Sequence, residues 1–163
     1  MSTPALYHAF ARYNRAMNDA VYAVCADLPD AERKADRGAF FKSVHGTLNH
    51  LMFGDHAWMN RFDGGSRPAP GTGVELFSDF DEMRAARETL DDEINAWAAA
   101  LTDAWLSETV EWTSRTDNLT FTQPRWILVS HMFNHQTHHR GQLTTILTQM
   151  GLDVGVTDFP KLV

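Results

Sequence analysis

The stretch that decides the fold is residues 124–151, PRWILVSHMFNHQTHHRGQLTTILTQMG, which predicts one long helix with a polar middle. Pro124 suits a first helical turn, and Gly151 suits the residue just beyond a helix end. Gly141 is unfavourable in a helix interior, so it predicts close packing against another helix. Apolar residues lie at both ends of this segment: Trp126, Ile127, Leu128, Leu143, Ile146, Leu147 and Met150. Between them, four histidines lie within nine residues, on the face that would normally carry leucine and isoleucine.

Three further segments have apolar residues at steps of three or four, the period of an amphipathic helix. They run from about Pro4 to Leu28, from Gly38 to Phe62 and from Asp79 to Asp103. A short helical turn is expected over Asp30–Arg33. Four long amphipathic helices predict an all-α fold, a four-helix bundle. The 163 residues are expected to form one domain, 1–163.

The segments between these helices carry turn signals. Residues 64–71, GGSRPAPG, form the strongest loop signal, and this loop is long enough for a crossover connection. From Leu106 to Phe121 the apolar period changes, which predicts a short hairpin-like excursion between the third and fourth helices. The tail, residues 151–163, contains Gly and Pro and is expected to extend over the surface.

The composition excludes several classes of protein. A net charge of −7 argues against a nucleic-acid partner, and the single cysteine, Cys25, excludes a disulfide framework and a cysteine-rich zinc module. No apolar run approaches the roughly 18 residues of a membrane span. The N-terminus lacks the basic and apolar regions of a signal peptide, so a cytoplasmic protein is expected. Cys25 is interpreted as inert packing, and the acidic run Asp91–Glu93 as a solvated face.

The histidines of residues 124–151 are spaced for metal binding. His135 and His139 are four residues apart, so both imidazoles project from one side of a helix, close enough to bind one ion. His131 lies one turn earlier and could be a satisfied histidine, a partner of a ligand, a proton shuttle or a fourth ligand. His138 is offset by about 100° from His139 and is not expected to be a ligand.

A second helix supplies a third imidazole. His50 lies in a stripe of small residues that would leave a space beside its ring: Ser43, Gly46, Thr47, Gly54 and Ala57. We interpret this stripe, together with Trp58, as the wall of a pocket. Three neutral imidazoles from two helices would leave coordination positions open, as at catalytic rather than structural metal sites. The alternative is a hydrogen-bonded polar core without a metal.

Each of the other polar residues near these histidines could have one of two roles. Asn49 and Asn134 each precede a proposed ligand, and either could orient an imidazole or make a polar contact between helices. Arg140 and Gln142 could bind an anionic group of a substrate or cofactor, or fix the tail of the chain. Asp55 could be a hydrogen-bond partner of a ligand or an exposed charge.

Residues 46–51, GTLNHL, and residues 134–142, NHQTHHRGQ, resemble the DinB/YfiT-like superfamily, and the resemblance covers nearly the whole chain. It implies a four-helix bundle in an up-down-down-up arrangement. It also implies a divalent metal ion, such as Zn, Ni, Fe or Mn, held by His50, His135 and His139. Some relatives have Glu at the position of His135. The resemblance further implies transferase or isomerase chemistry in which a low-molecular-weight thiol acts on a small-molecule substrate. It also implies that the protein forms a homodimer.

Three functions follow from these observations. The first is a metal-dependent enzyme, either a transferase that moves a low-molecular-weight thiol to a small electrophile or a hydrolase. The second is a non-catalytic metal-binding protein, and the third is a structural bundle with a polar core. The sequence contains no His-Glu-x-x-His, Gly-x-Ser-x-Gly or phosphate-loop motif. A bound metal would therefore be the agent of any catalysis.

Overall fold

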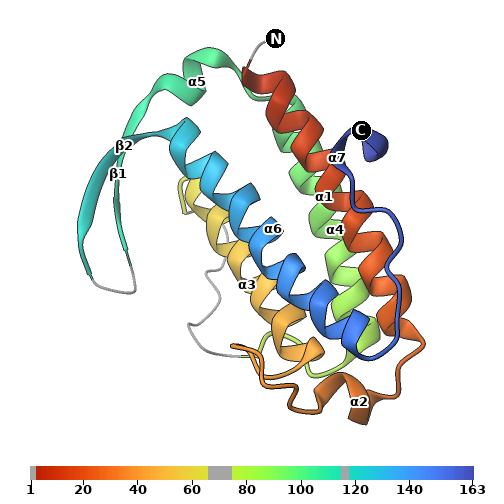
Figure 1. The fold of residues 1–163 in the computed structure, drawn as a ribbon. Helices are drawn as coiled ribbons and strands as arrows, with labels where there is room; N and C mark the ends of the chain where they lie inside the picture. The colour runs from red at the N-terminus through yellow and green to blue at the C-terminus, as the bar shows by residue number, and fades with distance from the viewer. Residues whose placement is uncertain (1–2, 66–74, 115–117) are drawn as a thin grey trace.

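The computed structural model describes residues 3–65, 75–114 and 118–163, and these are mostly helical. The four long helices are α1 (Thr3–Ala26), α3 (Val44–Phe62), α4 (Phe80–Ala99) and α6 (Arg125–Gln149). They lie side by side, with α1 against α4 and α6, and α3 against α6 and α4 (Figure 1). The short helices are α2 (Asp30–Lys34), α5 (Asp103–Ser107) and α7 (Phe159–Leu162). The expected all-α class is confirmed, with a small two-stranded sheet added.

Local chemistry sets the ends of the long helices. At the start of α3, the hydroxyl of Ser43 accepts a hydrogen bond from the Gly46 amide at 3.0 Å. Helix α3 begins at Val44 rather than at Gly38, because residues 39–42 form a tight turn in which Lys42 has a φ of 65°. Helix α6 begins directly after Pro124 and Gly151 follows its last turn, as the sequence predicts.

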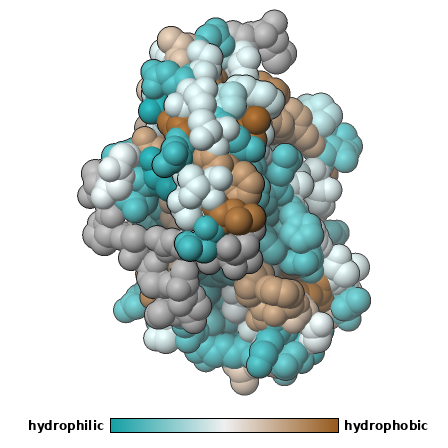
Figure 2. Space-filling view, turned by 90° about the vertical axis from the view of Figure 1, so that its left-hand side faces the viewer, coloured by the Kyte–Doolittle hydropathy of each residue, from teal (hydrophilic) through white to brown (hydrophobic). Residues whose placement is uncertain are grey.

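The excursion between α4 and α6 consists of α5 and a hairpin. Strand β1 (Thr109–Thr113) pairs antiparallel with β2 (Thr120–Pro124). Val110 and Trp112 are half-buried, while the residues that alternate with them on β1 are exposed. This alternation is the reason why the helical period is lost here. The face of the molecule next to the hairpin mixes hydrophilic and hydrophobic side chains (Figure 2).

The tail is extended from residue 152 to α7 and lies against α1. The Tyr13 hydroxyl donates to the carbonyl of Thr157 at 2.8 Å, and the Phe159 ring packs on Phe10 and Tyr13. Of the loop predicted at residues 64–71, Gly64 and Gly65 have positive φ angles, as turn residues often do. The rest of that loop lies outside the described residues.

Charged side chains lie in the core beside the apolar ones. Asp55 of α3, Arg87 and Asp91 of α4, and Arg140 of α6 are each at most 4% exposed. Arg87 binds Asp55 at 2.5 Å and Asp91 at 2.8 Å. The interpretation of residues 91–93 as a solvated face is wrong for Asp91. Helical periodicity turns Asp91 inward beside Leu90 and Ile94, where Arg87 neutralises it.

Side-chain amides complete this network and connect it to α1, the remaining long helix. Asn14 and Asn18 of α1 donate to Asp91 at 3.4 and 3.1 Å. Arg140 donates to Asn14 and Gln136, and Gln136 donates to Asp55. All four long helices therefore contribute to one buried polar network. Cys25 is fully buried, as expected. None of the helices among the described residues is long and apolar enough to span a membrane.

Candidate metal centre

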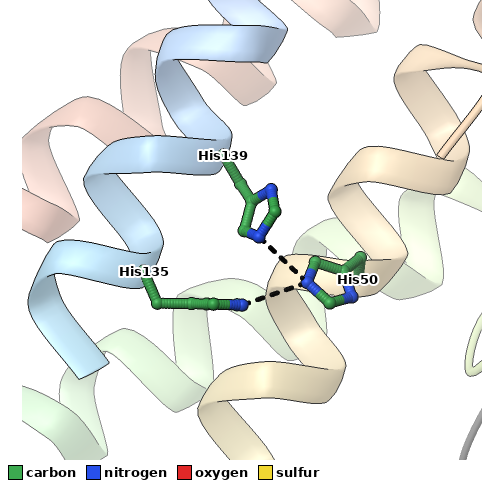
Figure 3. A group of neighbouring side chains, drawn as sticks. All are labelled: His50, His135 and His139. Atoms are coloured by element: carbon green, nitrogen blue, oxygen red, sulfur yellow. Dashed lines mark hydrogen bonds between the residues drawn. The ribbon is translucent and has the colours of Figure 1, made fainter. Parts of the chain in front are cut away.

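Three imidazoles from two helices converge on one point. His50 projects from α3, and His135 and His139 project from successive turns of α6, so the rings face one another across these helices (Figure 3). Nε2 of His50 lies 3.1 Å from Nε2 of His135 and 3.2 Å from Nε2 of His139. One ring nitrogen from each residue lies within 4.8 Å of the others.

This spacing suits three ligands of one ion. Nitrogen ligands about 2.1 Å from a shared ion, at angles of about 90–109°, would lie about 3.0–3.4 Å apart. Both contacts of His50 fall within that range. Imidazole is a common ligand of divalent Zn, Ni and Fe. The residues present therefore fit a divalent transition-metal ion.

The electrostatics of the centre favour neutral imidazoles, the form that binds metals. Burial, followed by the adjacent rings of His139 and His135, lowers the pKa of His50 to about 4. Burial also lowers the pKa of His135 to about 4, again with a contribution from His139. The pKa of His139 is lowered by burial as well. Protons therefore compete weakly for these nitrogens near neutral pH.

A hydrogen bond sets the tautomer of His139. Its Nδ1 lies 2.8 Å from Oε1 of Gln142, and an amide oxygen can only accept. Nδ1 therefore carries the proton, and Nε2 presents its lone pair to the centre. The amide nitrogen of Gln142 in turn donates to Nε2 of His138 at 3.3 Å. Gln142 thus orients one candidate ligand.

Packing helps to place His135, beside the contact of its Nε2 with His50. A Cβ atom at Gly54 would lie 2.9 Å from Cε1 of His135, so only glycine leaves room for this ring. Nδ1 of His135 is buried and has no hydrogen-bond partner among the described residues. The small residue at position 54 therefore makes space for a candidate ligand.

His50 is held by a ring stack that the sequence reasoning missed. The Phe41 ring lies 3.8 Å from the His50 ring at an interplanar angle of 18°, and it meets His139 edge-on. Phe41 reaches this position from the tight turn at residues 39–42. A phenylalanine in the turn before a helix carries no sequence signal for such a role.

Two cavities meet at His50, and His135 lines the second of them. The first has a volume of about 570 Å³ and the second about 480 Å³, and His50 and Phe53 line both. The first cavity is further lined by charged and polar residues, among them Lys34, Ser43, His45, Asn49 and Glu75. The second is further lined by Gly54, Ala57, Trp58, Arg61, Trp112, Ser114, His131 and His135. Small molecules could therefore approach the imidazoles from two sides.

His131 lies in the second cavity and outside the group of converging nitrogens. Its ring is 5.9 Å from the ring of His135 and 5.0 Å from that of Trp58. Burial, followed by the charge of Arg61, lowers the pKa of His131. His131 is thus placed beside the centre rather than in it.

The other candidate residues lie at varied distances from the centre. Oδ1 of Asn49 accepts hydrogen bonds from the amides of Leu76 and Phe77, both at 2.9 Å, so Asn49 holds that segment. Asn134 is exposed and lines a separate cavity beside α1 and the tail. Arg140 and Asp55 belong to the buried network described above.

The sequence model of the DinB family matches residues 1–163 of the chain. The matched range includes both histidine elements, α3 and α6. No curated protein matches the chain.

Proposed function

This chain belongs to the DinB family, and we propose that it is an enzyme that depends on a divalent metal ion held by His50, His135 and His139. The observation that carries this proposal is the convergence of one nitrogen from each of these residues. A protein built only for packing would have little reason to gather three imidazoles with lowered pKa values at the meeting point of two cavities.

The favoured activity is transfer of a low-molecular-weight thiol to a small electrophile. A bound divalent ion would lower the pKa of a coordinated thiol or water. Room for two molecules, one in each cavity, supports a two-substrate reaction over hydrolysis, which needs one organic substrate and water. Gln142 keeps the lone pair of His139 Nε2 directed at the ion, and Gly54 keeps the space for His135.

We assign His131 the role of proton acceptor in this reaction. It lines the second cavity next to His135, and its lowered pKa keeps a ring nitrogen neutral near pH 7. In this proposal it takes the proton that an incoming nucleophile releases.

The proposal includes the up-down-down-up arrangement and the homodimer that the family resemblance implies. The arrangement is supported by contacts at the α2 end of the molecule. Helix α3 begins shortly after α2, and the Ser78 carbonyl just before α4 accepts a hydrogen bond from Lys34 of α2 at 2.9 Å. Helices α1 and α6 both begin at the opposite end, where α5 lies (Figure 1).

Elemental analysis of untagged protein is the first test. We expect near-stoichiometric divalent metal in the wild type and its loss in His135→Ala, with His138→Ala as the matched control on the same helix. Untagged protein is needed because an affinity column can load nickel onto an open histidine site. Absence of metal in the wild type, with no uptake of Zn, Mn, Fe or Ni, would overturn the proposal.

A turnover screen would then separate the two activities. The metal-loaded protein is offered several low-molecular-weight thiols together with a set of electrophiles. Activity that requires the thiol supports the transferase, whereas activity that is independent of every thiol would show the hydrolase instead.

A further inference from the structure

A smaller cavity, of about 210 Å³, lies between α1, α6 and the tail of the chain. It is lined by Tyr13 of α1, by Arg140 and Gly141 of α6, and by Thr157 of the tail, and we call it the Arg140 cavity. The Tyr13 hydroxyl donates to the carbonyl of Thr157 at 2.8 Å, which fixes the tail as one wall. None of the three candidate metal ligands lines this cavity, so it is separate from the metal centre.

Arg140 is a buried cation without a directly bonded carboxylate. It is only 4% exposed, and burial lowers its pKa to about 10, so the guanidinium is still protonated at neutral pH. It donates to the amide oxygens of Asn14 and Gln136. The two carboxylates of the buried network bond instead to Arg87, and they act on Arg140 only from a distance. Arg87 therefore has two ion-pair partners, whereas Arg140 has none among the described residues.

One edge of the Arg140 guanidinium is free to bind a ligand. Both of its hydrogen bonds use Nη1, so Nε and Nη2 have no partner among the described residues. An arginine can bind a carboxylate or a phosphate through two parallel hydrogen bonds from such an edge. Because Arg140 lines the cavity, an oxyanion in this space would lie within reach of the guanidinium.

The charge of the Arg140 cavity favours an anion. Among the described residues in its lining, Arg140 is the only charged one. The Tyr13 ring, whose centre lies 5.7 Å from the guanidinium carbon, adds an aromatic wall. A cationic ligand would meet only a like charge here, whereas an anionic ligand would meet an opposite one.

Gly141 keeps the cavity open beside Arg140. A Cβ atom at this position would have none of its surrounding atoms within 4 Å, so no packing contact excludes a side chain. Glycine in a helix interior is nevertheless less favourable than alanine, by about 1 kcal/mol. Since Gly141 lines the cavity, a large side chain here would occupy part of the space. We interpret this glycine as leaving room for a ligand.

We propose that the Arg140 cavity binds a small oxyanion group, a carboxylate or a phosphate, through the guanidinium of Arg140. The neighbouring cavity of about 450 Å³, which Asn134 lines, shares Tyr13 and Thr157 with it and adds the ring of Phe10. An apolar group attached to the anion would find room there. This site requires no metal ion, so it goes beyond the proposed function and does not depend on it.

The test is calorimetric titration at constant ionic strength with benzoate, with inorganic phosphate and with benzamide, which has the shape of benzoate without its charge. The protein is titrated as purified and again after chelation and desalting, so that an anion bound to a metal ion is recognised. We expect saturable binding of at least one oxyanion in both samples, and the tighter of the two identifies the preferred group. Benzamide should bind about tenfold more weakly than benzoate, because it lacks the charge-assisted hydrogen bonds.

Two substitutions locate the binding. Gly141→Leu should weaken it about tenfold or more, because the new side chain fills the cavity and leaves the hydrogen bonds of Arg140 intact. Arg140→Lys, which keeps the charge and loses the two parallel hydrogen bonds, should weaken it as well, and circular dichroism shows whether this buried variant folds. Thr148→Leu is the matched control, because Thr148 is exposed on the same face of α6, two turns further on, and does not line the cavity.

Absence of binding by both oxyanions, or an affinity that either substitution leaves unchanged in a folded protein, would overturn the proposal. Binding of benzamide as tight as that of benzoate would overturn the role of the charge. Oxyanion binding that disappears on chelation would place the anion on a metal ion, and would also overturn the assignment of this cavity.

Discussion

Each histidine of the centre is positioned by a different kind of contact. His139 is oriented by the hydrogen bond between its ring and Gln142. His135 has space because residue 54 is glycine, and His50 is held by the stacked ring of Phe41. Each support comes from a different residue, so each can be removed by a substitution that leaves the histidines in the sequence.

Gln142→Leu removes the support of His139 while keeping a similar volume. We expect the affinity for a divalent ion to fall about 10- to 100-fold, because the ring can then rotate and adopt the other tautomer. Competition with a chromogenic chelator measures this change. His138→Ala is the control, since His138 contacts Gln142 but lies outside the converging group. Equal affinities of wild type and Gln142→Leu would contradict the role of this amide.

The lowered pKa values of His50 and His135 predict how acid affects the metal-free protein. Their ordinary pKa is 6.5, and in the folded chain it is about 4, so the unfolded chain takes up protons first as the pH falls. Their contribution to the free energy of unfolding is therefore complete above pH 6.5 and declines as the pH falls towards about 4. Urea denaturation across this window should show the decline, and His50→Asn should make it shallower. Identical pH dependence in the two proteins would argue against this linkage.

At the scale of single residues, the sequence predicted the histidines and missed their surroundings. The four-residue spacing places His135 and His139 on one side of any helix, independently of the rest of the fold. Asp91, in contrast, belongs to an acidic run that predicts a solvated face, because carboxylates are rarely buried. Its burial depends on Arg87 and on two asparagines of α1, and no local pattern shows such partners.

At the scale of the helices, the glycines of α3 and α6 can be compared. Gly54 of α3 and Gly141 of α6 both lie inside a helix, yet a Cβ at Gly54 would touch His135, whereas a Cβ at Gly141 would have none of its surrounding atoms within 4 Å. The predicted close packing at Gly141 is therefore wrong. This glycine is exposed, so nothing in its surroundings requires the absence of a side chain.

The same substitution should therefore have different effects in the two helices, on stability at Gly141 and on metal affinity at Gly54. Gly141→Ala should raise the free energy of unfolding by up to about 1 kcal/mol, because alanine has the higher helix propensity. Gly54→Ala should fold, since the far end of the His135 ring can move away, but metal affinity should fall because the ring is displaced. Thermal denaturation and chelator competition on both variants check this prediction. Unchanged metal affinity in Gly54→Ala would show that His135 does not need the space.

The elements themselves were predicted to different extents. Long helices with a regular apolar period were located to within a few residues, apart from the start of α3. There, the turn at residues 39–42 depends on the left-handed backbone of Lys42, which is uncommon for a residue other than glycine. The hairpin was expected, but the contact of Trp112 with Trp58 was not, because it joins segments far apart in the chain.

At the scale of the whole molecule, the buried network connects all four long helices. Arg87 is its central cation, and although burial by itself lowers the pKa of this group, Asp55 and Asp91 raise it. Arg87→Ala would leave both carboxylates buried without a direct ion-pair partner, which should cost about 3–5 kcal/mol of stability. Arg84→Ala is the matched control on α4, because its ion pair with Glu88 is exposed and should contribute less than about 1 kcal/mol. Urea denaturation of both variants measures the difference, and equal losses would contradict the central role of Arg87.

The network also bears on how the chain reaches its folded state. Asp55 lies on α3, its cation on α4, its amide donor on α6, and the asparagines that bind Asp91 on α1. Any intermediate that lacked one of these helices would leave a buried carboxylate or Arg87 without one of its partners, and would be unfavourable for that reason. We therefore expect folding in one cooperative step, with tryptophan fluorescence and circular dichroism changing together. The same buried charges disfavour mispaired assemblies, so they select which helices may become neighbours.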